Sequence, residues 1–240
     1  MENFQKIDSL LTRAKHKTLL TIFPHPDDET MASGGLLMRA KELGFKTVAV
    51  VLTEGAAGQM HIHPNGKTVK QIRRTELERA VKILGVDELV VGEFDDGKLR
   101  EQKDEWMKWV RKTIAKHDPG VVVTYDHTGF TGHPDHIALS LGIDEIPGDF
   151  ILLWPSIIEE LKARIVHAKL RDLTVSPTHC LDLGWRFIRK WRAASAHRSQ
   201  RLGKDLPVPL WLALGMYHFE WYHEVERGLK YPYKFVEFKI

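Results

Sequence analysis

Residues 18–29 read TLLTIFPHPDDE and give the clearest indication of the fold class. Its first six residues are apolar or β-branched without alternation, which is typical of a strand buried on both faces of a parallel sheet. Prolines and acidic residues then end the strand. A helical pattern follows over 30–43 and stops at Gly44, a residue type that commonly ends helices. A buried strand, a polar turn and a helix form the repeating unit of α/β folds.

The same alternation continues along the chain. The sequence predicts further strands over 47–52, 89–91 and 121–125, and further helices over 69–84, 101–116 and 134–141. Strands that alternate with helices in this way pair in parallel, with helices on both faces of the sheet. We therefore predict a Rossmann-like three-layer α/β/α fold with a mostly parallel sheet.

The pattern weakens beyond residue 149. Two short apolar runs, 151–154 and 165–168, are read as strands, and a basic helix is expected over 184–201. Neither an internal repeat nor a linker-like stretch is visible in the sequence. We therefore expect one domain over 1–240, in which 150–240 is a C-terminal elaboration.

Composition excludes several classes of protein. The chain has 240 residues, 43% hydrophobic and 28% charged, which is typical of a globular protein. Its only cysteine, Cys180, excludes an intrachain disulfide and a thiolate cluster, so a bound metal would need His, Asp or Glu. The net charge of +3 gives no indication of nucleic-acid binding. With no leader-like N-terminus and no long apolar segment, we expect a cytoplasmic protein without a transmembrane segment.

Two His-Pro-Asp segments follow predicted strands. HPDDE at 25–29 comes after the first strand, and GHPDH at 132–136 comes after the fourth. In open α/β sheets, ligands bind beyond the carboxyl ends of the strands, where both segments fall. Either segment alone is also a good helix start, because acidic residues and a proline suit the first turn. Capping does not, however, require three histidines with two carboxylates at converging strand ends. The two segments together therefore favour a catalytic site over a purely structural role.

The residue types in these segments suit a catalytic zinc site, which needs three protein ligands and an open position for water. His25, Asp28 and His136 can supply the ligands for one zinc, or another divalent ion, per chain. Asp27 is left free beside the metal and can take a proton from the attacking water.

Two further residues of the second segment complete this interpretation. His133 lies one helical turn before His136 and can donate to the oxyanion. Asp135 can orient or charge one of the histidines. The set predicts metal-assisted hydrolysis of a carbonyl compound.

HPDDE with Gly34-Gly35, and GHPDH after a VVVTYD strand, resemble the LmbE-like or PIG-L family of zinc-dependent N-acetylglucosamine deacetylases. The resemblance runs from about residue 19 to about residue 200. Further matching pieces occur in the same order, namely Thr53-Glu54-Gly55, Arg73-x-x-Glu76, Asp96-Gly97 and His197-Arg198-Ser199-Gln200. The resemblance implies removal of the acetyl group from a small amino-sugar substrate. It also implies that His25, Asp28 and His136 are the zinc ligands, that Asp27 is the general base, and that His133 stabilises the oxyanion or protonates the leaving amine.

The resemblance also places Arg73 and Asp96 where family members hold substrate hydroxyls or an anionic aglycone. Two departures from the family pattern bear on the substrate and on the proton donor. Ala56 and Ala57 stand where an acidic residue often follows the Thr-x-Gly turn, and Thr131 stands where some members carry a tyrosine.

Two alternative functions stay open at this stage. A sugar- or nucleotide-binding protein with a vestigial site would keep the fold but would need no general base, and the intact Asp27 counts against it. A thiol-conjugate amidase would use the same metal ligands with a different pocket, so the sequence separates it poorly from a deacetylase.

Three remaining features have plain interpretations. His61 and His63 could form a second metal site, but a surface loop over 54–67, with a lid or substrate-contacting role, is favoured. The segment 185–204 carries seven Lys or Arg and no acidic residue. It could contact a membrane, a phosphate or an acidic neighbour. We favour a solvated helix face, with Trp185 and Trp191 packed inward. The aromatic residues over 211–222 are expected in the core or at a subunit interface, so a homo-oligomer is possible.

Overall fold

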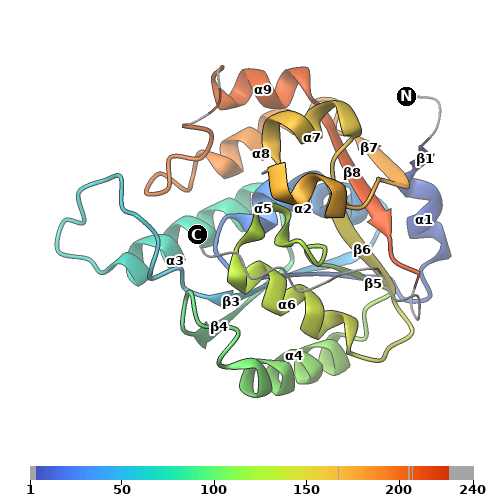
Figure 1. The fold of residues 1–240 in the computed structure, drawn as a ribbon, viewed down its shortest axis with the longest axis horizontal. Coiled ribbons are helices and arrows are strands. Elements are labelled where there is room, and N and C mark those ends of the chain that lie inside the picture. The colour runs from blue at the N-terminus through green and yellow to red at the C-terminus, as the bar shows by residue number, and fades with distance from the viewer. Residues whose placement is uncertain (1–3, 167, 205, 207, 227–240) are drawn as a thin grey trace.

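A mixed sheet of eight strands forms the centre of the computed structural model, which describes residues 4–166, 168–204, 206 and 208–226. The strands are β1 (Gln5–Lys6), β2 (Thr18–Phe23), β3 (Lys46–Thr53), β4 (Glu88–Phe94), β5 (Val121–Val123), β6 (Ile151–Ser156), β7 (His179–Asp182) and β8 (Phe219–Glu224). Their order across the sheet is β1-β7-β8-β6-β5-β2-β3-β4. β8 runs antiparallel to β6 and β7, and the other neighbours are parallel (Figure 1). The predicted mostly parallel sheet is confirmed.

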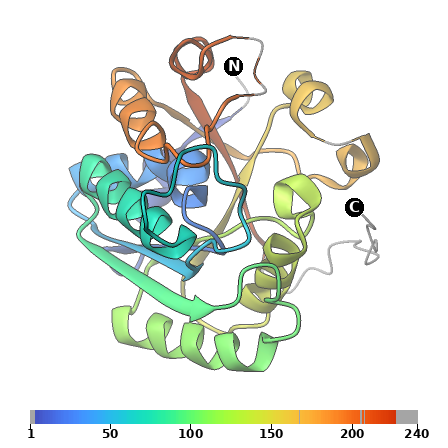
Figure 2. The same cartoon turned by 90° about the vertical axis from the view of Figure 1, so that its left-hand side faces the viewer.

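Helices cover both faces of this sheet (Figures 1 and 2). They are α1 (Ile7–Arg13), α2 (Asp28–Glu42), α3 (Val69–Leu84), α4 (Lys103–His117), α5 (Gly129–Gly132), α6 (Pro134–Asp144), α7 (Glu159–Ile165), the 3₁₀ helix η1 (Ala168–Leu173), α8 (Arg186–Ala194) and α9 (Leu210–Met216). α1, α2, α3 and α8 pack on one face, and α4 and α6 pack on the other. This is the predicted three-layer α/β/α arrangement.

Strand β2 shows why the sequence is apolar without alternation. Leu19 and Phe23 belong to the core under α1 and α2, whereas Leu20 and Ile22 belong to the core on the α4 and α6 side. Because side chains alternate across a sheet, a central strand with helices on both faces must be apolar at successive positions.

The position of β2 in the sheet creates a crevice. β3 and β4 extend the sheet on one side of β2, whereas β5 and β6 extend it on the other. The order therefore reverses between β2 and β5, which is the point where open α/β sheets bind ligands. Both His-Pro-Asp segments lie there, since 25–29 follows β2 and 132–136 follows β5 through the short helix α5.

The best-predicted helix is α3, whose bounds agree with the sequence at both ends. Thr68 caps its N-terminus in a capping box with Gln71, and Gly85 ends it in the left-handed conformation at φ 76°. The loop over 54–67 precedes this helix and runs beside the segment after α8, where the His61 N–H donates to the Ser199 carbonyl at 2.9 Å (Figure 2).

Three C-terminal predictions are wrong, and the first concerns a strand. The run 165–168 is not a strand, because α7 continues through Ile165 and η1 begins at Ala168; residue 167 lies outside the described residues. Its apolar character instead serves a small cluster, in which Val166 packs with Leu161 and Leu170. Short apolar runs of this kind do not distinguish strands from helix ends.

The basic helix is shorter than predicted. α8 covers Arg186–Ala194, and the chain then turns through residue 201, where Ser199 is bonded to Glu76 of α3. The prediction that Trp185 packs inward is also wrong, since this residue caps the helix and is 83% exposed, whereas Trp191 is half-buried. Among the described residues, no helix combines the length and apolar character needed to cross a bilayer.

Candidate active site

Three donor atoms from the two His-Pro-Asp segments converge at the β2–β5 crevice. His25 Nδ1 lies 3.3 Å from His136 Nε2 and 3.5 Å from Asp28 Oδ2, and the last two atoms are 3.6 Å apart. Tetrahedral zinc with bonds of about 2.0–2.1 Å holds its ligand atoms about 3.3–3.4 Å from one another. The three side chains are buried and contain the nitrogen and oxygen donors that such an ion takes. The residues present therefore fit a metal ion.

The hydrogen bonds of the two histidines leave the correct nitrogens free to coordinate an ion. His136 Nδ1 is 2.9 Å from the Gly129 carbonyl, to which it can donate, so Nε2 carries the lone pair. His25 Nε2 lies 3.1 Å from Asp135 and 3.0 Å from Asp96, so it is the protonated nitrogen and Nδ1 carries the lone pair. Gly129 has a φ of 62°, and a Cβ there would approach His136 Cβ to 2.7 Å, so this close contact requires glycine.

Asp28 is the first residue of α2, and two contacts hold its carboxylate in addition to those with the imidazole rings of His25 and His136. The Tyr125 hydroxyl donates to Asp28 Oδ1 at 2.7 Å, and the His25 N–H donates to Oδ2 at 3.0 Å. The Tyr125 ring also stacks on His136, with centroids 4.3 Å apart. Burial raises the pKa of Asp28, but His136, His25 and the Tyr125 hydroxyl outweigh burial and hold that pKa well below its usual range. An ionised carboxylate is the form that binds a metal ion.

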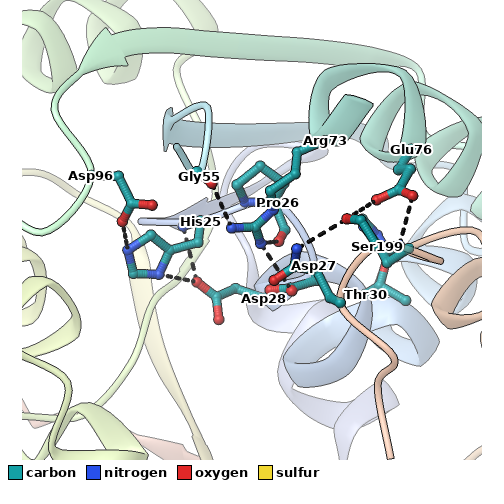
Figure 3. Close-up of polar contacts among 12 residues, drawn as sticks. His25, Pro26, Asp27, Asp28, Thr30, Gly55, Arg73, Glu76, Asp96 and Ser199 are labelled. Carbon is teal, nitrogen blue, oxygen red and sulfur yellow. Dashed lines mark hydrogen bonds and ion pairs between the residues drawn. The ribbon is translucent and has the colours of Figure 1, made fainter. Parts of the chain in front are cut away.

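Asp27 stands beside this cluster in a strained conformation. It is the N-cap of α2, with φ 104° and ψ −30°, a region that costs an L-residue about 1–3 kcal/mol. Its Oδ2 accepts a hydrogen bond from Arg73 Nη2 at 3.0 Å (Figure 3). Burial and the neighbouring Asp28 charge raise the pKa of Asp27, although Arg73 opposes this effect. A half-buried carboxylate with a raised pKa has the character of a general base.

His133 lies at the open side of the cluster and is half-buried. It caps α6, and its Nδ1 accepts a hydrogen bond from the Asp135 N–H at 3.2 Å. Its ring centroid is 4.7 Å from that of His25 and 5.0 Å from that of His136. Burial and the nearby His25 lower the pKa of His133. Its Nε2 can therefore face a ligand bound in the crevice.

Asp135 and Asp96 lie behind His25. Asp135 accepts from the N–H groups of Gly97 at 2.7 Å and Leu99 at 3.0 Å, besides its contact with His25. Asp96 accepts from the Ala57 N–H at 2.8 Å. Burial lowers the pKa of His25, but the carboxylates of Asp135, Asp28 and Asp96 outweigh burial and raise it. These contacts orient the His25 ring and tie it to the loops after β3 and β4.

Arg73, which the resemblance places at the substrate, has its contacts within the protein. It is 4% exposed, and its guanidinium donates to the carbonyls of Gly55 at 3.1 Å and Pro26 at 2.5 Å, besides Asp27 (Figure 3). A Cβ on Gly55 would approach the guanidinium to 2.2 Å, so this glycine makes room for the arginine. Arg73 therefore joins the loops after β2 and β3.

Sequence reasoning assigned no role to Tyr125, Glu29 or His197. Tyr125 lies two residues after the end of β5, so the rule about strand ends could have identified it. Glu29 accepts from the Asp27 N–H at 3.0 Å, and His197 Nε2 lies 3.6 Å from Glu29 Oε1. Burial lowers the pKa of His197, but the carboxylates of Glu29, Asp27 and Glu76 raise it, and the net shift is upward.

Two further groups of potential metal ligands overlap the His25–Asp28–His136 triplet at His25. His25 with His133 and His136, and His25 with Asp96 and Asp135, each have one donor atom per residue within 4.8 Å of the others. Within the part of the chain that the structure describes, neither group includes His61 or His63. His63 instead contacts Asn65 at 2.9 Å, and His61 contacts Lys204 at 3.3 Å. The interpretation as a surface loop is thus favoured over a second metal site.

Comparisons with known proteins agree with this geometry. Residues 20–146 match the family GlcNAc-PI de-N-acetylase (PIG-L). The chain is 30% identical over 188 residues to a diacetylchitobiose deacetylase of Thermococcus kodakarensis, covering 77% of this chain and 70% of that protein. It is 26% identical over 187 residues to a probable N-acetyl-α-D-glucosaminyl L-malate deacetylase of Bacillus anthracis, covering 76% and 80%.

A solved structure shares the fold over almost the whole chain. The N,N′-diacetylchitobiose deacetylase of Pyrococcus horikoshii superposes with a TM-score of 0.65 at 18% identity, covering 94% of this chain and 95% of that one. The family match includes both His-Pro-Asp segments, which hold the convergent donor atoms. The chain therefore belongs to the GlcNAc-PI de-N-acetylase (PIG-L) family.

Proposed function

We propose that this protein is a zinc-dependent hydrolase that removes the N-acetyl group from an N-acetylglucosamine-type sugar or conjugate. The observation that carries the proposal is the convergence of His25 Nδ1, Asp28 Oδ2 and His136 Nε2 at separations of 3.3–3.6 Å, with the carboxylate of the preceding residue, Asp27, outside this triplet and paired with Arg73. Membership of a deacetylase family supports the reaction, and the names of its relatives support the class of substrate.

His25, Asp28 and His136 would hold the zinc. When bound, zinc polarises the amide carbonyl and lowers the pKa of water. Asp27 is the general base, because it is next to the ligand Asp28 and, among the described residues, its side chain caps no backbone N–H of α2. Arg73 fixes the direction of this carboxylate by donating to Oδ2, and Oδ1 is left for the attacking water.

His133 assists on the opposite side of the crevice. With its Nδ1 accepting from the Asp135 N–H, its Nε2–H can donate a hydrogen bond to the developing oxyanion. The proton that Asp27 takes from the water would pass to the leaving amine. A half-buried position suits this role, since the group must reach the substrate while remaining partly shielded from water.

The sequence-based roles of Arg73 and Asp96 in binding substrate stay predictions, as do the cytoplasmic location and any homo-oligomer. The contacts of Arg73 and Asp96 support positioning roles, in which Arg73 positions Asp27 and Asp96 positions His25. Asp135 likewise acts through His25. The small-molecule substrate would then be held mainly by the loop over 54–67 and by the residues around His133.

The geometry favours this function over a vestigial binding site. A binding protein would not need a strained Asp27 beside a triplet of donor atoms, because strain persists only where surrounding contacts maintain it. A thiol-conjugate amidase would share the same ligands, so the choice of substrate is the part that experiment must decide.

The test combines metal analysis with an assay of amine release. Zinc-loaded protein is expected to contain one ion per chain and to release amine from N-acetylglucosamine, from its β-linked dimer or from an N-acetylglucosaminyl conjugate. A chelator should abolish the activity, and added zinc should restore it. Protein with stoichiometric zinc that releases no amine from any of these compounds would contradict the proposal, and amine release from a thiol conjugate alone would select the amidase.

A further inference from the structure

The strain at Asp27 can be traced to the peptide group that joins it to Pro26. A half-turn of this peptide would bring the φ of Asp27 from 104° to about −76°, an ordinary value for an L-residue. The backbone could thus relax by a local movement alone. The strained form must therefore be held by contacts that the relaxed form would lose.

Charged partners hold both polar groups of this peptide. The Pro26 carbonyl accepts from Arg73 Nη2 at 2.5 Å, and the Asp27 N–H donates to Glu29 Oε2 at 3.0 Å. After a half-turn, the carbonyl would face the Glu29 carboxylate and the N–H would face the guanidinium, and both pairings are unfavourable. The arrangement of charges therefore selects the strained form.

Glu29 needs support of its own, because it is fully buried. Its Oε1 accepts from the Thr30 hydroxyl at 2.6 Å, and His197 Nε2 lies 3.6 Å from the same oxygen. His197 is also buried, and neither of its ring nitrogens forms a hydrogen bond within the described part of the chain. A buried carboxylate is costly without a positive partner even when neutral groups donate to it, and the His197 imidazole is the group placed beside Glu29 to act as that partner.

The segment that carries His197 is itself anchored to the site. The next residue but one, Ser199, donates to Glu76 through its N–H at 2.8 Å and its hydroxyl at 2.6 Å, as Figure 3 shows. Glu76 lies one turn of α3 beyond Arg73. One helix therefore positions both Arg73, at the Pro26 carbonyl, and the chain segment that brings His197 to Glu29.

We propose that Glu29 and His197 are positioning residues for Asp27. His197 holds the Glu29 carboxylate in place, and Glu29 holds the Pro26–Asp27 peptide in its strained orientation, which aims the Asp27 side chain along the crevice. The inference rests on the proposed function only for the role of Asp27 as a base. The strained backbone and its contacts do not depend on the identity of the substrate.

Three variants and a matched control test this proposal. Glu29→Met removes both acceptor oxygens and should lower kcat by about 10²-fold, because misplacement of a reacting group by about 1 Å has an effect of this size. Glu29→Gln keeps an acceptor for the Asp27 N–H, but its amide can also donate to a rotated Pro26 carbonyl, so its kcat should lie between those of the wild type and Glu29→Met. His197→Phe should lower kcat at least about fivefold. The control is His179→Phe, since His179 is a buried histidine 3.9 Å from Glu224 in β7 and β8, and this variant should keep wild-type kcat.

The readouts separate positioning from a general loss of structure. In Glu29→Met and His197→Phe, KM should stay within about threefold of wild type and zinc content should stay at one per chain, because the ligands are untouched. Crystal structures of the two variants should show a negative φ at Asp27 or a displaced residue 29. Wild-type kcat in His197→Phe, with residue 29 and the Asp27 backbone unchanged, overturns the proposal even if Glu29→Met does not fold. If the wild-type protein releases no amine, the proposed function fails, and the variant structures still decide the positioning.

Discussion

The two His-Pro-Asp segments share three residues and use them in opposite ways. In the first segment, His25 supplies a donor nitrogen to the convergent triplet and Asp27 is the free carboxylate. In the second, His133 is the free imidazole and Asp135 is bonded to His25. The donor atom of the second segment comes from His136, beyond the shared triplet.

The difference originates in where each helix begins. The N-cap of α2 is the third residue of its segment, Asp27, whereas the N-cap of α6 is the first residue of its segment, His133. The φ of Asp27 is 104°, and the φ of His133 is an ordinary −63°. The two helices thus begin at different residues of the shared triplet, and its histidine and aspartate have different contacts in each segment. The same three residues do not by themselves determine a role in the site.

The largest effect is expected when the donor triplet is broken. His136→Ala removes the donor nitrogen that the second segment contributes to the triplet, and the two remaining ligands cannot hold zinc tightly. Metal content after dialysis should fall to less than about 0.1 ion per chain, and amine release should fall to background. Metal analysis by mass spectrometry checks this outcome. One tightly bound ion in the variant would exclude His136 from the ligand set.

The next effect concerns the free carboxylate of the first segment. Asp27→Asn keeps the shape of the side chain and leaves the three ligands intact, so zinc should stay at one ion per chain. The loss of the general base should lower kcat by about 10²–10⁴-fold. Steady-state kinetics on protein of known metal content measure this change. If Asp27→Asn turned over at the wild-type rate, the base would have to be another residue.

The corresponding aspartate of the second segment should have a smaller effect. Asp135→Asn weakens the contact with His25 Nε2 but leaves every ligand in place. Removal of such a supporting hydrogen bond typically costs 10–100-fold in metal affinity or activity, so a loss of about that size is expected. Competition with a chelator measures the affinity, and Asp95→Asn, at the exposed residue before Asp96, provides the control. Equal zinc affinity in Asp135→Asn and wild type would contradict the supporting role.

Much of the fold could be predicted because local signals agreed with tertiary packing. Strand β2 has the predicted bounds, since helices cover both of its faces and its apolar run is uninterrupted. α3 has the predicted bounds because a capping box and a terminal glycine mark them. The run 165–168 failed because its apolar residues serve a small cluster between two short helical elements, and length alone could not show this.

The candidate site also has features that the sequence could predict and features that it could not. The convergence of His25, Asp28 and His136 follows from the rule that strand ends meet at the switch point, so their proximity could be expected from sequence. The strain at Asp27 could not, because it depends on Arg73 and Glu29 pinning one peptide from different elements. Contacts between residues far apart in the chain, such as Glu29 with His197, leave no periodic signal.

The smallest effect is expected on stability, when the proline of the second segment is replaced. Pro134 is exposed and occupies the first turn of α6, where no backbone N–H is needed and its fixed φ suits the helix. Pro134→Ala should therefore destabilise the protein by only about 0.4–1 kcal/mol, chiefly because the unfolded chain gains freedom. Zinc content should not change, and urea denaturation measures the free energy of unfolding. A loss well above this range would mean that the second segment is also held in a strained form, and the contrast with the first segment, where strain is confined to Asp27, would fail.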